Sequence, residues 1–403
     1  MLDPNSACTM VRPERACMLA YTFYESDGRV MRYAEALTQE GIRVDAIVLG
    51  REGQPREETI NGVRVIRVQA RRRDELSKLS YLARLLKFFI RSAAEVTKQH
   101  FVKPYGLIHV HSVPDFEVFA AIVPKLLGSR VILDIHDIVP EFYAAKFGVG
   151  ERSVAFRALR VVEWLSAAFA DHVIAANDLW RDRLVRRATR SDKCSALINY
   201  PDLSVFRREL RTRTEDGRFV MVYPGTLSRH QGLDIAVRAV AVAAPQAPAL
   251  ELHIYGEGPS KPELASLVQE LGLADKVFLH APMPLRQIAT VMADADLGIV
   301  PKRDDSFGGE AFSTKILEFM ALGVPLVVAD TRIDRHYFDP TLLRFFRSGN
   351  VESLAKTVLA AYRERDASAA LSAKAFEYAQ RNSWANRKHD YLGVVRRLTA
   401  SHA

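Results

Sequence analysis

The chain has little cysteine. Its 403 residues include three cysteines, Cys8, Cys17 and Cys194, and none forms a Cys-x-x-Cys pair. No cluster of cysteine and histidine has the spacing of a zinc site. We therefore expect neither a structural disulfide nor structural zinc, a pattern that suits a reducing cytoplasm.

Long apolar runs are also missing. A membrane-spanning helix needs roughly 20 consecutive apolar residues, and no stretch reaches that length. The first apolar run, Ala16–Phe23, is short and follows residues of both charge signs, whereas a signal peptide begins with a cationic segment. We predict that this run is a buried strand and that the protein is cytoplasmic.

The order of apolar and polar segments predicts two α/β domains. A strand at Ala16–Phe23 is followed by a polar loop, a helical pattern that ends near Gly41 and a strand at Val44–Leu49, which is the unit of a parallel sheet. The periodicity stops around 199–202, a charged stretch follows, and the same alternation restarts at Phe219. We predict an N-terminal domain over 1–205, a C-terminal domain over 206–380, and a last helix over 381–403 that packs back toward the N-terminal domain.

The densest group of polar residues lies at 308–321. Two glycines, Gly308 and Gly309, let the backbone approach a ligand. A helix then begins near Ser313, whose hydroxyl or that of Thr314 can cap it, and its first amides favour an anion such as a diphosphate. Lys315 adds a positive charge in the first turn. The alternative is an ordinary surface helix, but the combination with a glycine loop after a strand favours a binding site.

Polar residues also follow two strands of the first half. His111 and Asp115 come after the strand at 107–110, and His136 and Asp137 after the strand at 131–135. Ligands of open α/β sheets bind beyond the carboxyl ends of the strands, so these positions indicate a site. The alternative for each histidine is a structural hydrogen bond.

These motifs resemble the retaining glycosyltransferases of the GT-B fold, in family 4. Glu310 and Glu318 form the Glu-x7-Glu signature of that family, and the segment 313–325 is similar to its branch for bacterial exopolysaccharide and O-antigen assembly. The segments 109–116, 133–141, 225–227, 230–234 and 255–259 also resemble that branch. The resemblance spans nearly the whole chain and implies two Rossmann-like, doubly wound domains that face each other across a cleft.

The resemblance implies roles by position. It places Glu310 on the hydroxyls of the donor sugar and Glu318 on the ribose, with His136 and Asp137 near the reacting centre. The residues expected to bind the donor nucleotide are Gly225, Thr226, Arg229, Gly256, Glu257, Gly258, Lys302, Lys315, Ile316, Leu317 and Glu318. The residues expected on the acceptor side are Gly28, His111 and Asp115.

The chain departs from the family pattern at two cations. Many members carry arginine where this chain has Thr226 and lysine where it has Gln231. The cations for the diphosphate must then come from Arg229, Lys302 or Lys315. Since family members neutralise the diphosphate with basic side chains, we expect no metal and no cofactor.

A basic amphipathic stretch at 76–101 bears on the acceptor. The chain's net charge is +8, and the segment 64–103 alone holds eleven basic against three acidic residues. A helix with this pattern can lie on an anionic membrane, at the inner face of the cell membrane. The alternative is a core helix with a solvated charged face. No nucleic-acid-binding motif is present, so we expect no nucleic-acid partner.

The sequence therefore predicts a hexosyltransferase. We expect it to move a hexose-type sugar, with retention, from a nucleotide-sugar to a glycan or polyprenyl-diphosphate-linked acceptor in surface polysaccharide synthesis. A sugar-nucleotide epimerase of the same fold and a non-catalytic partner protein that binds nucleotide or lipid are the alternatives.

Overall fold

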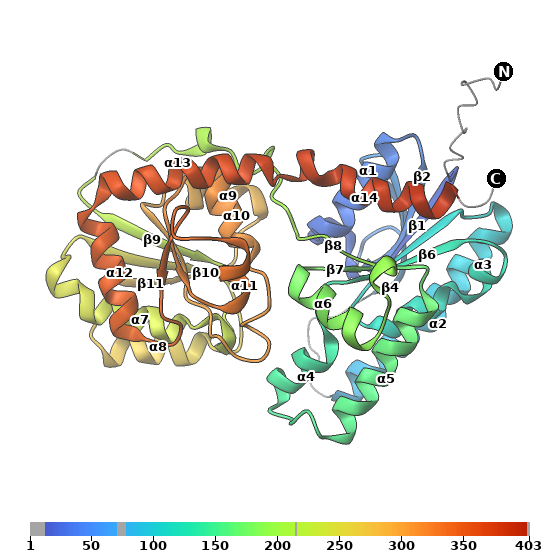
Figure 1. Ribbon diagram of the computed structural model, residues 1–403, viewed down its shortest axis with the longest axis horizontal. Helices are drawn as coiled ribbons and strands as arrows, with labels where there is room; N and C mark the ends of the chain where they lie inside the picture. The colour runs from blue at the N-terminus through green and yellow to red at the C-terminus, as the bar shows by residue number, and fades with distance from the viewer. Residues whose placement is uncertain (1–12, 71–77, 214–215, 401–403) are drawn as a thin grey trace, which may run out of the picture. The chain divides into compact units, whose positions relative to one another are not determined.

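The computed structural model describes residues 13–70, 78–213 and 216–400. The chain divides into two compact units: unit 1 runs to Ile198 and takes up the chain again from Lys388, and unit 2 is Asn199–Arg387 (Figure 1). The first boundary lies a few residues before the predicted 205/206. The second divides the C-terminal helix α14 (Trp384–Thr399), most of which belongs to unit 1.

Unit 1 is built on a sheet in which the described residues form eight strands, in the order β3-β4-β2-β1-β5-β6-β7-β8. Only β3 is antiparallel to its neighbour. The interior strands are buried on both faces, as parallel sheets covered by helices require. The strands are β1 (Arg15–Phe23), β2 (Arg43–Gly50), β3 (Glu57–Ile60), β4 (Val63–Ala70), β5 (Leu107–His111), β6 (Arg130–Ile135), β7 (His172–Ala175) and β8 (Cys194–Ala196).

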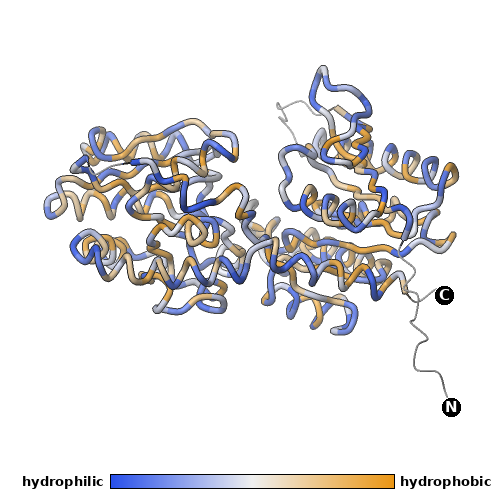
Figure 2. Tube along the Cα trace, turned by 90° about the horizontal axis from the view of Figure 1, so that it is seen from above, coloured by the Kyte–Doolittle hydropathy of each residue, from blue (hydrophilic) through white to orange (hydrophobic). Residues whose placement is uncertain are grey.

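Amphipathic helices cover this sheet, and the hydropathy along the tube alternates within them (Figure 2). Besides α14 they are α1 (Gly28–Gln39), α2 (Lys78–Val102), α3 (Ile122–Leu126), α4 (Val139–Phe147), α5 (Val154–Phe169) and α6 (Asp178–Arg187). The predicted helix at 76–101 corresponds to α2, and residues 76 and 77 lie outside the described residues.

Unit 2 has a wholly parallel sheet of six described strands in the order β11-β10-β9-β12-β13-β14. Its strands are β9 (Phe219–Pro224), β10 (Leu250–Tyr255), β11 (Val277–His280), β12 (Leu297–Val300), β13 (Leu326–Ala329) and β14 (Arg344–Phe346). Its helices are α7 (Leu233–Ala243), α8 (Lys261–Glu270), α9 (Leu285–Ala293), α10 (Thr314–Leu322), α11 (Arg332–Tyr337), α12 (Val351–Arg363) and α13 (Arg365–Arg381).

The strand order gives each unit one topological switch point. In unit 1 the order reverses between β1 and β5, and in unit 2 between β9 and β12. Ligands of open α/β sheets bind at such points, beyond the carboxyl ends of the strands. The switch points therefore locate one candidate binding region in each unit: next to His111 in unit 1 and next to Gly225 in unit 2.

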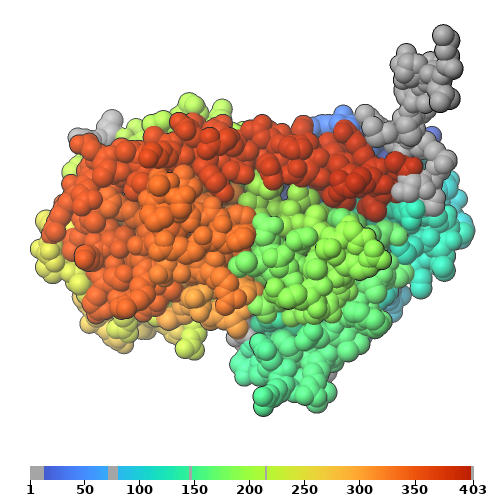
Figure 3. All heavy atoms as spheres, in the orientation of Figure 1, coloured from blue at the N-terminus to red at the C-terminus, as the bar shows by residue number. Residues whose placement is uncertain are grey.

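The C-terminal helix α14 lies on the surface of unit 1, drawn in red in Figure 3. Its Tyr391 is fully buried, and the ring stacks on Tyr33 of α1 with 4.3 Å between centroids. The Tyr391 hydroxyl lies 3.0 Å from Nδ1 of His109 on β5. Through this residue the end of the chain becomes part of the core beneath the switch point of unit 1.

Candidate functional site

A cavity of about 480 Å³ lies at the switch point of unit 2. Its wall contains six of the predicted donor residues: Gly225, Thr226, Gly256, Glu257, Lys315 and Glu318. They come from three separate segments, which are the loop after β9, the loop after β10 and the first turns of α10. We call it the Lys315 cavity.

Gly225 has a backbone conformation that favours glycine, and the Lys315 side chain passes over it. Gly225 has φ of +136°, and a Cβ built on it would lie 2.5 Å from Cε and 3.1 Å from Nζ of Lys315. The amine of Lys315 also lies 5.1 Å from the centre of the Tyr223 ring. The strand end therefore has no side chain where the lysine passes over it.

Lys315 is a half-buried cation. Burial lowers its pKa to about 8, although the charge of Glu318 acts in the opposite direction. No ion pair joins Lys315 to another residue within the described ranges. An amine held in this state gains much from an anion that enters the cavity, since the anion compensates for the lost water.

The predicted Gly256-Glu257-Gly258 turn supports the floor of the cavity. A Cβ on Gly258 would lie 2.2 Å from the carbonyl oxygen of Leu227, and one on Gly256 would lie 1.8 Å from that of Gly225. The Leu227 amide donates to Glu257 O at 2.9 Å. The two loops therefore pack backbone on backbone, which only glycine permits, and Gly258 supports the cavity from outside its lining.

One wall of the cavity is apolar, and the sequence interpretation missed it. It consists of Phe206, Pro282, Met283, Leu285, Ile288 and Met292. Met283 and Leu285 are among the few large apolar side chains that unit 2 exposes. The available signal was position, because Pro282 and Met283 follow the carboxyl end of β11 as the other lining loops follow their strands. Such a wall suits a planar base.

The structure places Glu310 in the loop before α10, outside this lining. Glu310 is 5% exposed, and its Oε1 accepts a hydrogen bond of 2.6 Å from Arg332. The loop is anchored by Asp305, which accepts from the amides of Phe307 and Gly308. Glu310 and Glu318 therefore lie in different surroundings although they belong to one motif.

Two of the three cations proposed for the diphosphate do not line the Lys315 cavity. Lys302 is 2% exposed, donates to Ala311 O at 2.7 Å and pairs with Asp334 at 3.0 Å. It therefore fixes the loop rather than offering a charge to the cavity. Arg229 lines a second cavity of about 570 Å³ with Arg238.

The start of α10 also differs in detail from the prediction. Ser313 is the N-cap residue, but its side chain makes no capping hydrogen bond. Its Oγ is buried and has no hydrogen-bond partner among the described residues. The side chains of Ile316 and Leu317 are fully buried in the core, so only their backbone is left to serve a ligand.

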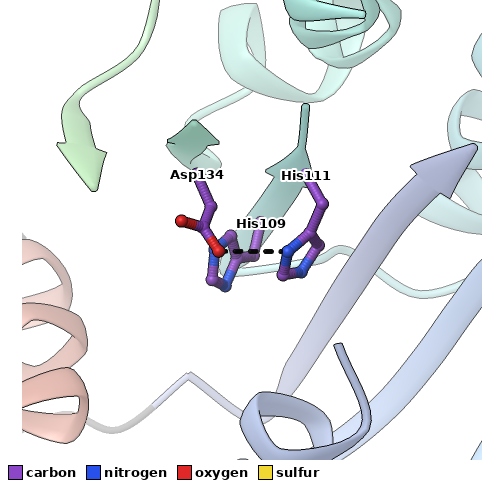
Figure 4. Close-up of side chains that lie close together, drawn as sticks. All are labelled: His109, His111 and Asp134. Atoms are coloured by element: carbon purple, nitrogen blue, oxygen red, sulfur yellow. Dashed lines mark ion pairs between the residues drawn. The ribbon is translucent and has the colours of Figure 1, made fainter. Parts of the chain in front are cut away.

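In unit 1, His111 and Asp134 face each other as register partners on β5 and β6. Figure 4 shows them beside His109, which is on the same strand as His111. Asp134 is fully buried and receives two hydrogen bonds of 2.8 Å from Nε and Nη2 of Arg29. Burial acts to raise the pKa of Asp134, but Arg29 and His136 outweigh it and hold that pKa well below its usual range.

The predicted His136 joins this group. Its Nε2 lies 3.0 Å from Oδ2 of Asp134 and 3.2 Å from Nδ1 of His111. The predicted Gly28 is the first residue of α1, directly before Arg29, and the Asp27 side chain caps this helix. The structure thus brings Gly28, His111 and His136 together around an arginine and an aspartate that the sequence interpretation did not select.

Asp115 is a second buried acidic residue of unit 1, and Asp137 is half-buried. Burial raises the pKa of Asp115 to about 7, against the effect of the hydrogen bond from Ser112 Oγ, and the charge of Asp137 adds to the rise. Burial also raises the pKa of Asp137, and His136 opposes this. Both carboxyl groups are therefore closer to neutral than exposed aspartates.

His109, His111 and Asp134 could be read as a metal site, because their ligand atoms lie within 4.8 Å of one another. Both oxygens of Asp134 already accept from Arg29, whose positive charge opposes a second cation. Burial lowers the pKa of both histidines, which leaves them able to ligate a metal, so it is the charge of Arg29 that disfavours a metal. The donor set fits an arginine-bound carboxylate better than a metal.

Comparisons with known proteins assign both halves of the chain. The family model "Glycosyl transferases group 1" matches residues 207–378, and "Glycosyl transferase 4-like domain" matches residues 28–199. A D-inositol 3-phosphate glycosyltransferase of Thermomonospora curvata is 27% identical over 325 residues, which are 74% of this chain and 73% of the relative.

Solved structures share the fold. Sucrose-phosphate synthase from Thermosynechococcus elongatus superposes with a TM-score of 0.79 at 18% identity, over 96% of this chain and all of the other. Anabaena HepE in complex with UDP gives 0.67 at 17%, over 94% and 99%. WaaG, a glycosyltransferase involved in lipopolysaccharide biosynthesis, gives 0.70 at 14%, over 94% and 99%.

The different surroundings of Lys302 and Lys315 give a stability prediction. Lys302→Met leaves Asp334 buried without its cation, and we expect it to lower the free energy of unfolding by about 3–5 kcal/mol. Lys315→Met, the matched control, removes a half-buried amine that has no ion pair and should leave stability unchanged or raised at pH 7. Urea unfolding of both variants measures this, and equal losses would contradict the assignment.

Proposed function

Because the chain belongs to the GT-B glycosyltransferases of family 4, we propose that it transfers a hexose-type sugar, with retention of configuration, from a nucleotide-sugar to a glycan or a polyprenyl-diphosphate-linked acceptor. The pathway we propose is bacterial surface polysaccharide synthesis, and WaaG, a structural neighbour, acts in lipopolysaccharide biosynthesis. The observation that carries the proposal is the Lys315 cavity, where the half-buried amine of Lys315, a glycine strand end and Glu318 converge.

The parts of the cavity suit the parts of a nucleotide-sugar. The apolar wall with Met283 and Leu285 offers a surface for the base, and Glu318 offers a carboxylate for the ribose hydroxyls. Lys315 and the first amides of α10 are available for the diphosphate. HepE, of the same fold, was solved with UDP, which makes UDP a suitable first probe.

We infer retention from the family signature, and without an evident side-chain nucleophile we propose that departure and attack take place on the same face of the sugar. The departing phosphate takes the proton of the acceptor hydroxyl, and the protein stabilises the negative charge on that phosphate. We assign the stabilisation of that negative charge to Lys315. No cofactor takes part in this proposal, and basic side chains replace a metal at the diphosphate.

The first test measures nucleotide release from UDP-, GDP- and ADP-sugars with and without a membrane lipid extract. We expect release that depends on one donor and on the lipid, and a product anomer identical to that of the donor in an NMR spectrum. Glu318→Ala should weaken nucleotide binding about 10- to 150-fold, the loss of a hydrogen bond to a charged group. Glu263→Ala, in the other cavity, is the control.

The outcomes separate the alternatives. A donor converted to its epimer without acceptor would establish an epimerase, and nucleotide binding without turnover under any condition would favour a non-catalytic protein. Unchanged affinity in folded Glu318→Ala would remove the ribose assignment.

Lys315 also predicts how nucleotide binding depends on pH. Because its pKa is about 8 in the empty protein, and a diphosphate favours the charged amine, UDP binding must raise that pKa and take up a proton. The dissociation constant for UDP should be flat below pH 7 and weaken up to tenfold per pH unit above pH 8. Calorimetry in two buffers measures the proton. Lys315→Met should bind weakly and without this dependence, and pH-independent wild-type binding up to pH 9.5 would refute it.

The acceptor proposal rests on the outer surface of unit 1. Among the described residues, the large exposed apolar side chains outside α2, α5 and the α3 region (122–127) are only Val242, Leu271, Met283 and Leu285. The α2 and α5 helices pack on either side of the turn at 115–121, through Phe89–Phe116 and Phe119–Phe169 ring contacts. These helices therefore form one layer, which we call the α2–α5 layer.

The charges of this layer favour an anionic membrane. The acidic residues within α2 and α5 are Glu95 and Glu163, and both are buried in pairs with Arg56 and Arg187. The exposed charged side chains of the two helices are basic: Lys87, Arg91, Lys98, Arg157 and Arg160. Exposed apolar side chains flanked only by cations fit a monolayer surface.

The structure also limits the contribution of the basic segment 64–103. Arg64 pairs with Glu57, Arg67 with Glu25 and Glu58, and Lys103 with Glu14. Their charges are thus largely compensated by residues outside the segment. Arg71, Arg72 and Arg73 lie outside the described residues. No helix among the described residues is long and apolar enough to cross a membrane, so we propose peripheral association at the inner face.

We expect the protein to bind vesicles that contain phosphatidylglycerol and not neutral phosphatidylcholine vesicles. The double variant Leu86→Glu/Val161→Glu, with one change on each helix, should lower the bound fraction at least tenfold, whereas Val242→Glu, an exposed apolar position of unit 2, should not. Flotation measures the bound fraction. An equal loss of vesicle binding in the double variant and in Val242→Glu, or no loss in either, would favour the alternative of a core helix with a solvated charged face.

A further inference from the structure

His136 is held by Asp134, which is itself held by Arg29. In unit 1 this histidine lies at the carboxyl end of β6, and its side chain is 22% exposed. Its Nε2 lies 3.0 Å from Oδ2 of Asp134, which is itself fully buried. Arg29, 6% exposed, reaches Asp134 from α1 with a two-pronged contact and donates its third hydrogen bond to Leu197 O at 2.8 Å.

The proton positions follow from this geometry. Asp134 is an ionised acceptor, so each nitrogen that approaches it must carry a hydrogen. Its Oδ2 accepts from Arg29 Nε at 2.8 Å, and it also lies 3.0 Å from His136 Nε2 and 3.3 Å from His111 Nδ1. His136 must therefore carry a hydrogen on Nε2.

The other side of the His136 ring is different. No hydrogen bond joins its Nδ1 to any residue that the structure describes. With Nε2 donating to Asp134, Nδ1 is the acceptor of the ring when the ring is neutral. The rings behind it are fixed, because His109 stacks on His111 at 4.2 Å and lies 3.0 Å from the Tyr391 hydroxyl of α14.

We propose that Arg29 and Asp134 are positioning residues that lock His136 in the Nε2-protonated form, so that Nδ1 accepts a hydrogen bond from a hydroxyl group of the sugar substrate. The contact with the sugar rests on the proposed glycosyltransferase function, whereas the locked form of His136 does not. Arg29 keeps Asp134 ionised inside the sheet, Asp134 fixes the proton and the ring plane, and only the outward nitrogen of His136 meets the substrate.

A buried pair elsewhere in unit 1 provides the control. Arg15 pairs with Asp45 on the neighbouring strand, both side chains are less than a tenth exposed, and both lie at the start of their strands, away from His136. Asp45→Asn thus removes the same kind of buried carboxylate as Asp134→Asn does, without touching the histidine.

The test reads the His136 ring directly. Long-range ¹H–¹⁵N spectra of the ¹⁵N-histidine-labelled full chain, assigned with His136→Gln, should show Nε2 protonated in the wild type and in Asp45→Asn. In Asp134→Asn and in Arg29→Lys the His136 signal should show a mixture of the two neutral forms. A wild-type ring protonated on Nδ1, or variants with unchanged forms, would overturn the proposal.

A second measurement separates positioning from stability. With the donor that the panel identifies, Asp134→Asn should lower the turnover number about 100-fold, the cost of a misplaced group, with UDP affinity within twofold of wild type. Asp45→Asn should lose no more than twofold. Equal losses in the two variants would overturn the proposal, and Arg29→Lys repeats the test should Asp134→Asn not fold. If no donor reacts, the proposed function fails, while the spectra still decide the form of His136.

Discussion

The desolvation of Lys315 is the constraint on which the unit 2 site depends. An amine partly taken out of water without an ion pair is costly, and the backbone around Lys315 is arranged to accommodate it. Gly225 leaves room for its last carbon, and the Tyr223 ring faces its charge. The glycine turn after β10 then packs against the same loop. The site therefore holds a positive charge that has no anionic partner among the described residues. A diphosphate would supply that partner.

In unit 1, by contrast, the buried charge already has its partners. There the buried carboxylate of Asp134 is fully provided with donors, from Arg29, His111 and His136. Such a network resists change, because removal of one member leaves another charge buried without a partner. It can therefore fix a ring, and it gains little from a further ion. The site in unit 2, where a cation lacks an anion, therefore suits ligand binding. The site in unit 1, where the carboxylate has all its donors, suits the orientation of a side chain.

The sequence predicted well where the signal is local. Gly225, Lys315 and Glu318 stand in short motifs next to strand ends, and the structure places them in one cavity. It could not separate Lys302 from Lys315, because the partner of Lys302 is Asp334, supplied by a different helix. Nor could it find Arg29, which meets Asp134 105 positions away. Contacts between distant segments follow from topology rather than from any pattern within a segment.

The exposed face of unit 1 shows why charge must be read after folding. Counted along the chain, the positive excess lies at 64–103, yet Arg64 and Arg67 are paired in the structure. The cations that remain exposed on α2 are joined by Arg157 and Arg160 of α5, a helix that the count along the chain did not single out. The folded distribution puts unpaired cations beside Leu86, Ile90 and Trp164. An apolar surface with cations at its border favours an anionic lipid over a neutral partner, because burial of the apolar side chains and attraction to the lipid charge then both favour binding.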